Sequence, residues 1–159
     1  MHNYLLYSNK LLAIFLLIYC FSIFTNTYSQ SEVDSSKNLT IVIGDTILFT
    51  NLCDSGSYKF IDLYTKTRYE DSILKFNPST GEGFYKTFFQ TEGDFDSKRL
   101  GCSYANSKFT IISTQYFEDK NTKEERFIVF VMLEDWRKVA WIEFIDAYQL
   151  GEIELIAAK

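Results

Sequence analysis

Residues 127–133 read Phe-Ile-Val-Phe-Val-Met-Leu, an uninterrupted apolar run in the C-terminal third of the chain. Its β-branched and aromatic side chains are typical of a strand that is covered on both faces. A buried helix is the alternative interpretation, but the acidic residues that flank the run favour a strand. The run therefore predicts the central strand of a sheet.

The segments on either side of this run continue the β pattern. Residues 108–117 and 126–134 are two long β-prone runs around the charged segment 118–125, which predicts a hairpin. Residues 139–145 follow the polar segment 135–138 and complete an antiparallel meander.

A short helix is predicted after the meander. The spacing of Asp146 and Gln149 matches a capping box, and Gly151 stands where a short helix would end. We therefore expect a mainly β fold, a small antiparallel barrel or sandwich with one short C-terminal helix.

The N-terminal half gives weaker signals. Residues 39–43 and 46–50 are β-rich and flank Gly44-Asp45, which predicts a hairpin with a type II′ turn. Residues 58–64 predict a third strand, and the mixed polarity of both of its faces indicates an edge or partly exposed position.

The middle of the chain is less regular. Residues 84–89 are apolar at spacings that fit a short helix and a strand equally well, and they follow a turn-forming segment with the only proline. Residues 90–107 are rich in Gly, Asp, Ser and Asn, which predicts a long irregular segment.

Residues 1–29 have the pattern of a secretory signal peptide. Lys10 precedes the apolar run 11–24, and Thr27 and Ser29 are small residues before an expected cleavage site. A membrane span is the alternative, but the run is shorter than the roughly 20 residues that a span needs. Removal of the signal leaves a flexible leader, residues 30–38, and one β-rich domain, residues 39–159. The expected location is secreted or periplasmic.

Cysteine and histidine usage restricts the chemistry. Cys53 and Cys102 remain after signal removal, and an oxidising compartment favours a disulfide between them over two buried thiols. Cys20 is in the signal; acylation there, as in lipoproteins, is a rival outcome, although Tyr19 fits that motif poorly. The only histidine is His2, so Ser-His-Asp catalysis, Cys-His catalysis and His-ligated zinc sites are excluded for residues 30–159.

The charge of the chain selects among partners. Residues 30–159 contain 15 basic and 21 acidic side chains, a net charge of −6. This charge argues against nucleic acid and anionic membrane as partners, because both are bound through basic patches. It fits a cationic protein. Acidic residues occupy alternate positions in the segment 92–96, as they do in a calcium-binding loop. The glycine and the distal glutamate of an EF-hand are missing. No cofactor or metal is expected.

The predicted contact surface lies near the disulfide. It comprises Asp94, Phe95, Asp96 and Tyr104, with Trp136 as an aromatic neighbour, because central aromatic residues supply binding energy and rim acids attract a basic partner. Alternatively, the acids maintain solubility and the aromatic residues are lids on the core.

Two function classes follow from these observations. We expect an exported, non-catalytic binding or interaction domain, an inhibitor of or partner to a cationic protein. The alternative is a carboxylate-dependent secreted hydrolase of the glycosidase type, which needs two carboxyl groups, one with a raised pKa. Its candidate acids are Glu82, Glu92, Asp94 and Asp96.

Overall fold

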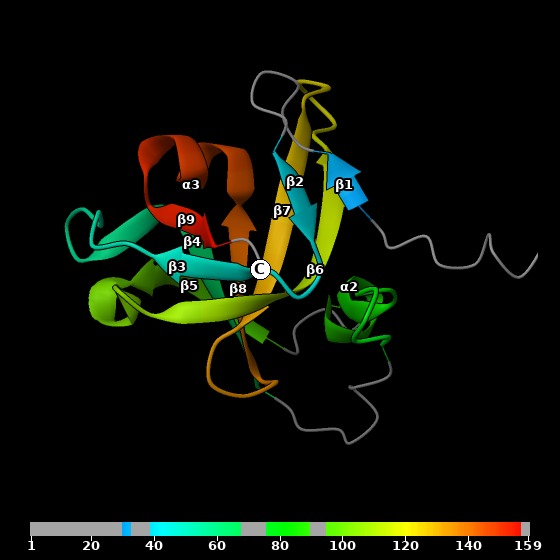
Figure 1. Cartoon of the computed structure of the whole chain (residues 1–159), viewed down its shortest axis with the longest axis horizontal. Coiled ribbons are helices and arrows are strands. Elements are labelled where there is room, and N and C mark those ends of the chain that lie inside the picture. Colours follow the sequence, from blue (N-terminus) through cyan, green and yellow to red (C-terminus); the bar gives the residue numbers. More distant parts are fainter. Residues whose placement is uncertain (1–29, 33–38, 68–75, 90–94, 157–159) are drawn as a thin grey trace, which may run out of the picture.

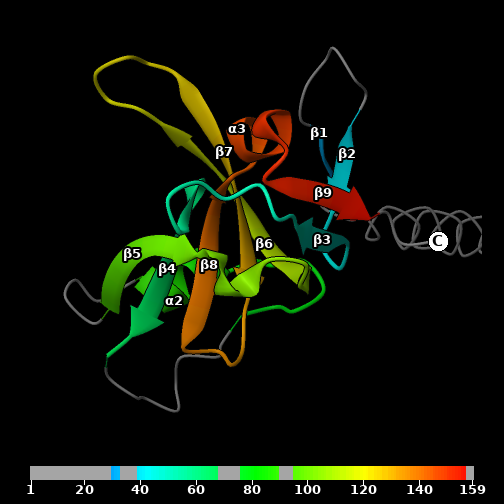
Figure 2. The same cartoon turned by 90° about the vertical axis from the view of Figure 1, so that its left-hand side faces the viewer.

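Seven antiparallel strands form one curled sheet, a half-barrel that is open at both edges (Figures 1 and 2). The computed structural model describes residues 30–32, 39–67, 76–89 and 95–156. Across the sheet the strands are β5 (Phe95–Gly101), β4 (Ser57–Lys66), β8 (Lys138–Glu143), β7 (Glu125–Met132), β6 (Lys108–Glu118), β3 (Thr46–Phe49) and β9 (Ile153–Ile156). The mainly β fold class is confirmed. The predicted signal segment lies outside the described residues.

The meander β6-β7-β8 is confirmed, and β7 is its central strand. β7 pairs with β6 through Thr114↔Val129 and with β8 through Val129↔Ile142. Its five residues from Phe127 to Val131 are all buried, at 3% exposure or less. Continuous burial requires a cover on both faces of the sheet, which explains why this strand reads as an unbroken apolar run.

Each face of the sheet has its own hydrophobic cluster. Phe127, Val129 and Val131 of β7 belong to the larger cluster, which α3 (Phe144–Leu150) helps to bury with Phe144 and Ala147. The alternate residues Ile128 and Phe130 belong to a second, mostly aromatic cluster. That cluster lies under α2 (Phe84–Phe89), so the two helices cover opposite faces (Figure 1).

The predicted N-terminal hairpin is wrong. β2 (Thr40–Val42) pairs with β1 (Gln30–Glu32), whereas β3 pairs with β6 and β9. The turn between β2 and β3 is nevertheless ordered by polar contacts. Gly44, at φ +99°, donates its N–H to the carbonyl of Ile111 at 2.9 Å, and the Asp45 carboxylate accepts the N–H of Val42 at 2.9 Å. These bonds direct the chain from one sheet into the other. β1 also lies where a flexible leader was expected.

β4 and β5 differ from the prediction in a related way. β4 is partly exposed, as one of the two predicted positions required, but it is not an edge strand, because it lies between β5 and β8. α2 covers Tyr64 of β4, whose ring centroid is 5.1 Å from that of Phe89. β5 replaces part of the expected irregular segment. It is an edge strand whose four consecutive residues from Asp96 to Arg99 are exposed, so its polar composition resembles that of a loop.

The two helices are short, and their ends are set by glycines and turns. Residues 84–89 are helical, which decides between the two structures that fitted this segment. The C-terminal helix is confirmed but begins at Phe144, without a side-chain cap from Glu143. It ends as expected at Gly151, which adopts the left-handed conformation with φ +81°.

The predicted disulfide between Cys53 and Cys102 is confirmed, with a Cα–Cα distance of 6.0 Å. It joins the loop after β3 to the short 3₁₀ turn η2 (Cys102–Tyr104) that follows β5. Among the residues whose positions the structure gives, no helix has the length and apolar character that spanning a bilayer requires.

Candidate functional site

Phe95 and Asp96, two residues of the predicted contact surface, lie at the start of β5. The half-buried Phe95 ring is 5.5 Å from the ring of Tyr64 and 5.3 Å from that of Phe89, between ring centroids. Both neighbours belong to the aromatic cluster under α2. Phe95 therefore contributes to the core, while Asp96 is exposed and Asp94 lies outside the described residues.

Tyr104 and Trp136 lie elsewhere. The Tyr104 ring packs on the opposite cluster, 6.1 Å from the ring of Phe109, and its hydroxyl donates to Glu134 Oε1 at 2.7 Å. Glu134 and Trp136 are both in the turn between β7 and β8, where Trp136 is half-buried. The structure thus brings Tyr104 to the turn that carries Trp136, whereas the contacts of Phe95 are on the other face of the sheet.

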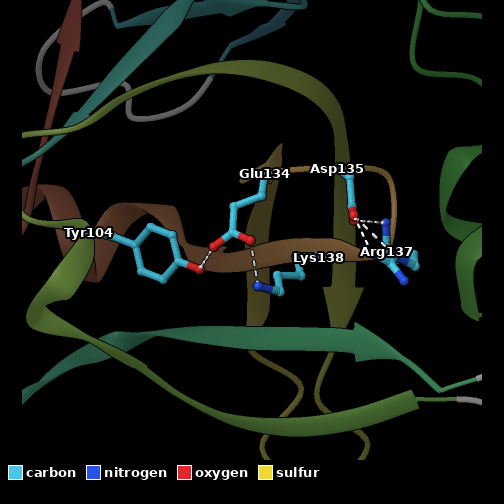
Figure 3. A network of polar contacts seen from close by, with 5 residues as sticks. All are labelled: Tyr104, Glu134, Asp135, Arg137 and Lys138. Atoms are coloured by element: carbon cyan, nitrogen blue, oxygen red, sulfur yellow. Dashed lines mark hydrogen bonds and ion pairs between the residues drawn. The ribbon is translucent and has the colours of Figure 1, made fainter.

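The β7–β8 turn is held by its own charged side chains (Figure 3). Lys138 Nζ donates to Glu134 Oε2 at 2.5 Å, opposite the bond from Tyr104. Arg137 donates to Asp135 Oδ2 through two nitrogens, at 2.7 and 3.1 Å. Leu133 donates its N–H to the carbonyl of Lys138 at 2.9 Å and closes the turn.

These contacts shift the titration of the groups involved. Burial, and then the hydrogen bond to Glu134, raise the pKa of Tyr104 to about 12. The bonds from Lys138 and Tyr104 lower the pKa of Glu134, and the bonds from Arg137 lower that of Asp135. Each carboxylate in the turn is thus stabilised as an anion by partners within the chain. These charges hold the turn together.

A cavity of about 490 Å³ lies at the opposite end of β7, between the hairpin tip and the start of α3. α3 packs against β7, and the two are adjacent in both cartoon views (Figures 1 and 2). We call this cavity the hairpin pocket. Its lining residues are Phe60, Glu124, Glu125, Arg126, Phe127, Glu143, Ile145 and Asp146.

Strand register places the charged residues of the hairpin pocket together. Glu143, the last residue of β8, pairs with Ile128 of β7. Arg126 is two residues from Ile128, so its side chain leaves the same face and reaches Glu143 diagonally. The Arg126 Nη1 to Glu143 Oε2 distance is 3.5 Å, and the side chains are 49% and 21% exposed. This is a loose ion pair at the mouth of the cavity.

Phe60 reaches the pocket because a buried carboxylate fixes the backbone of β4. Glu152, only 1% exposed, accepts the N–H of Lys59 and, at 3.0 Å, the N–H of Phe60. These two bonds occur where the β4–β5 register shifts between Ser57 and Asp62. A buried carboxylate is tolerated when hydrogen bonds compensate its desolvation, so Glu152 serves as a structural anchor.

The hairpin pocket combines acidic walls with an apolar floor. Four carboxylates and one guanidinium line it, a net charge of −3, and the half-buried Phe60 and Ile145 supply apolar surface, whereas the Phe127 side chain is only 3% exposed. Among the described residues, Glu125 and Asp146 have no ion-pair partner. Outside the cavity, the Lys59 ammonium already lies 4.9 Å from the Phe60 ring centroid. The site suits a cation that carries an apolar stem.

Sequence reasoning did not select the residues of the hairpin pocket. Glu124 and Glu125 were assigned to a hairpin tip and Asp146 to a helix cap, which are ordinary positions for acids. The length of the charged segment 118–125 between two apolar strands could have indicated a functional site. Nothing in the sequence indicated that α3 would bring Asp146 beside it.

A carboxylate-dependent hydrolase needs two carboxyl groups, one of them with a raised pKa. Burial raises the pKa of Asp62, against the opposing effect of Arg99, but Asp62 pairs with Arg99 at 3.1 Å and does not line the hairpin pocket. A second cavity, of about 560 Å³ beside Gly81 and Ser113, has one carboxylate in its lining, that of Glu82. No group of three or more potential metal ligands occurs in the described part of the chain.

Comparisons of the chain with protein-family models, with curated proteins and with solved structures found no match.

Proposed function

We propose that this protein is an exported, non-catalytic binding domain that holds a basic segment of a partner protein in the hairpin pocket. One observation carries the proposal: the cavity is lined by charged side chains with a net charge of −3 and also by the half-buried Phe60 and Ile145. Its volume is within the range of pockets that hold a ligand group of several atoms.

The walls and floor of the pocket act on different parts of a basic side chain. The alkyl stem of Lys or Arg gains from contact with Phe60 and Ile145, while its charged head meets the carboxylates. A partly enclosed cation is also screened less by salt than one on an open surface. The net charge of −6 on residues 30–159 adds a longer-range attraction, which raises the association rate.

Export is supported by two independent features. Residues 1–29 have the composition of a signal peptide, and the domain contains a disulfide between Cys53 and Cys102. Disulfides persist in oxidising compartments and are rare in the cytosol of most organisms. The proposed partner is therefore a basic protein encountered outside the cytosol.

The proposal is tested with fluorescently labelled tetra-arginine as the probe and anisotropy as the readout. At about 10 mM ionic strength, where the Debye length is about 30 Å, we expect saturable binding. The variant Glu143→Gln/Asp146→Asn should weaken binding about tenfold, because two surface-type ion pairs contribute up to about 1 kcal/mol each.

A matched control separates the pocket from general electrostatics. Glu82 and Glu154 are exposed and do not line the hairpin pocket, so Glu82→Gln/Glu154→Gln changes the net charge equally. We expect this variant to lose less than threefold in affinity. Equal losses in both variants, with unchanged melting temperatures, would contradict the proposal, as would the absence of binding by the parent protein.

A further inference from the structure

We infer that Arg126 is an internal competitor for the hairpin pocket: its guanidinium holds Glu143 in the free protein, in the place that a partner's guanidinium takes. The inference rests on the proposed function and deepens it by naming arginine as the partner's side chain. It also assigns a regulatory contact to the same site.

The position of Arg126 supports this role. It lines the same cavity as the carboxylates and is the one cation among the lining residues. The distance from Arg126 Nη1 to Glu143 Oε2 is 3.5 Å, which is long for a charge-assisted hydrogen bond. A half-exposed pair of this kind contributes little to stability, so an incoming cation can displace it.

Asp119 is a second carboxylate that the charge of Arg126 affects. The backbone N–H groups of Thr122 and Asn121 lower the pKa of Asp119, and the charge of Arg126 lowers it further. Arg126 is therefore within electrostatic range of the hairpin turn as well as of Glu143.

The chemistry of the pocket favours arginine over lysine in the incoming segment. A guanidinium is planar, stacks on aromatic rings and presents paired donors that match one carboxylate. The pocket offers the half-buried ring of Phe60, and Glu143 is already paired with one guanidinium. An ammonium is a compact, strongly hydrated charge that gains less from an aromatic floor. The pair between Arg126 and Glu143 is itself a contact of a guanidinium with this carboxylate.

The test uses the same tetra-arginine probe with Arg126→Gln and a matched control, Lys123→Gln. Lys123 is in the same hairpin and pairs with Glu118 at 2.9 Å, but it does not line the pocket. We expect Arg126→Gln to raise the affinity about fivefold and Lys123→Gln to raise it less than twofold. Tetra-lysine should bind more weakly than tetra-arginine and should gain less from Arg126→Gln.

The outcomes separate the two proposals. If the parent protein and Arg126→Gln both fail to bind the probe, the proposed function is wrong. If the parent binds but Arg126→Gln binds equally or more weakly, Arg126 is not a competitor, although the pocket proposal stands. An equal gain in Lys123→Gln would show only a general charge effect and would overturn the inference. Arg126→Lys keeps the charge, so a gain from this variant would also contradict it.

Discussion

The two ends of β7 both carry clusters of charged side chains, but the clusters differ in how their charges are compensated. At the Met132 end, Glu134 is bonded to Tyr104 and Lys138 (Figure 3). At the other end, Glu125 lies directly opposite Glu118 in the β6–β7 register. Like charges at opposed positions of an antiparallel pair are destabilising. One end uses its charges to build a turn, and the other leaves negative charge uncompensated beside a cavity.

This difference indicates where a partner would gain most. A carboxylate that is already bonded twice offers little to a new cation, because an existing contact must be broken first. Glu125 and Asp146, which have no ion-pair partner among the described residues, offer their full charge. The uncompensated end is therefore the functional candidate.

The largest expected effect concerns the disulfide that holds the compensated end. Cys102→Ser opens a loop with a sequence separation of 49 residues. The chain-entropy model then predicts a loss of about 4 kcal/mol in the free energy of unfolding. Urea denaturation monitored by tryptophan fluorescence measures this loss. Cys53→Ser is the matched variant and should lose the same amount. A loss below about 1 kcal/mol in both variants would contradict the prediction.

The parts of this fold that the sequence predicted depend on local contacts. The meander follows from consecutive apolar runs joined by short charged turns, and the helix end follows from Gly151. The parts that were missed depend on distant segments. β3 appeared to belong to a hairpin because its neighbour in sequence is β-prone, but its actual partners are β6 and β9. No local pattern encodes that choice.

The hairpin pocket was missed for the same physical reason. Phe60 reaches it because Glu152, 92 residues away, accepts the N–H of Phe60. The predicted surface around Phe95 had the right residue types, an aromatic among acids. The structure places that ring in the core, because α2 brings Phe89 against it. Composition thus led to a predicted surface around Phe95, whereas the hairpin pocket could be found only from the tertiary structure.

The second prediction compares a carboxylate from each end of β7. Glu125→Gln should raise the free energy of unfolding by up to about 0.5 kcal/mol, because it removes the repulsion from Glu118. The gain is small since Lys123 already pairs with Glu118 at 2.9 Å. Glu134→Gln should lower stability, because the amide loses the charged bond to Lys138. Thermal denaturation at low salt measures both changes.

The comparison is tested by the signs of the two changes in the free energy of unfolding, which should be opposite for Glu125→Gln and Glu134→Gln. Salt at about 1 M, where the Debye length is about 3 Å, should abolish the gain from Glu125→Gln. If both variants are destabilised equally at low salt, the two ends of β7 do not differ as we describe.

The smallest expected effect is on alkaline titration at the compensated end. Burial and the bond to Glu134 raise the pKa of Tyr104 to about 12, from the ordinary value of 10.0. A group whose folded pKa is raised contributes stability that is complete below its unfolded pKa and is lost as the pH rises through the folded pKa. The contribution of Tyr104 should therefore be complete below about pH 10 and decline between about pH 10 and 12. Tyrosinate absorbance should show a late-titrating phenol that Tyr104→Phe removes.

The control must account for other tyrosines, since burial, followed by the charge of Glu125, also raises the pKa of Tyr116. Tyr116→Phe should leave the latest step in place. Glu134→Gln separates the two causes at Tyr104: removing the charged acceptor should bring the pKa of Tyr104 part of the way back toward 10.0, while the larger effect of burial remains. Burial also raises the pKa of Tyr58 and Tyr64, so these phenols contribute to the late part of the titration as well. If Tyr104→Phe leaves the whole late part unchanged, Tyr104 does not titrate late and Glu134 does not hold its phenol. In that case the network around Glu134 would not be compensated as the contrast with Glu125 requires, and the uncompensated charge would no longer distinguish the hairpin pocket.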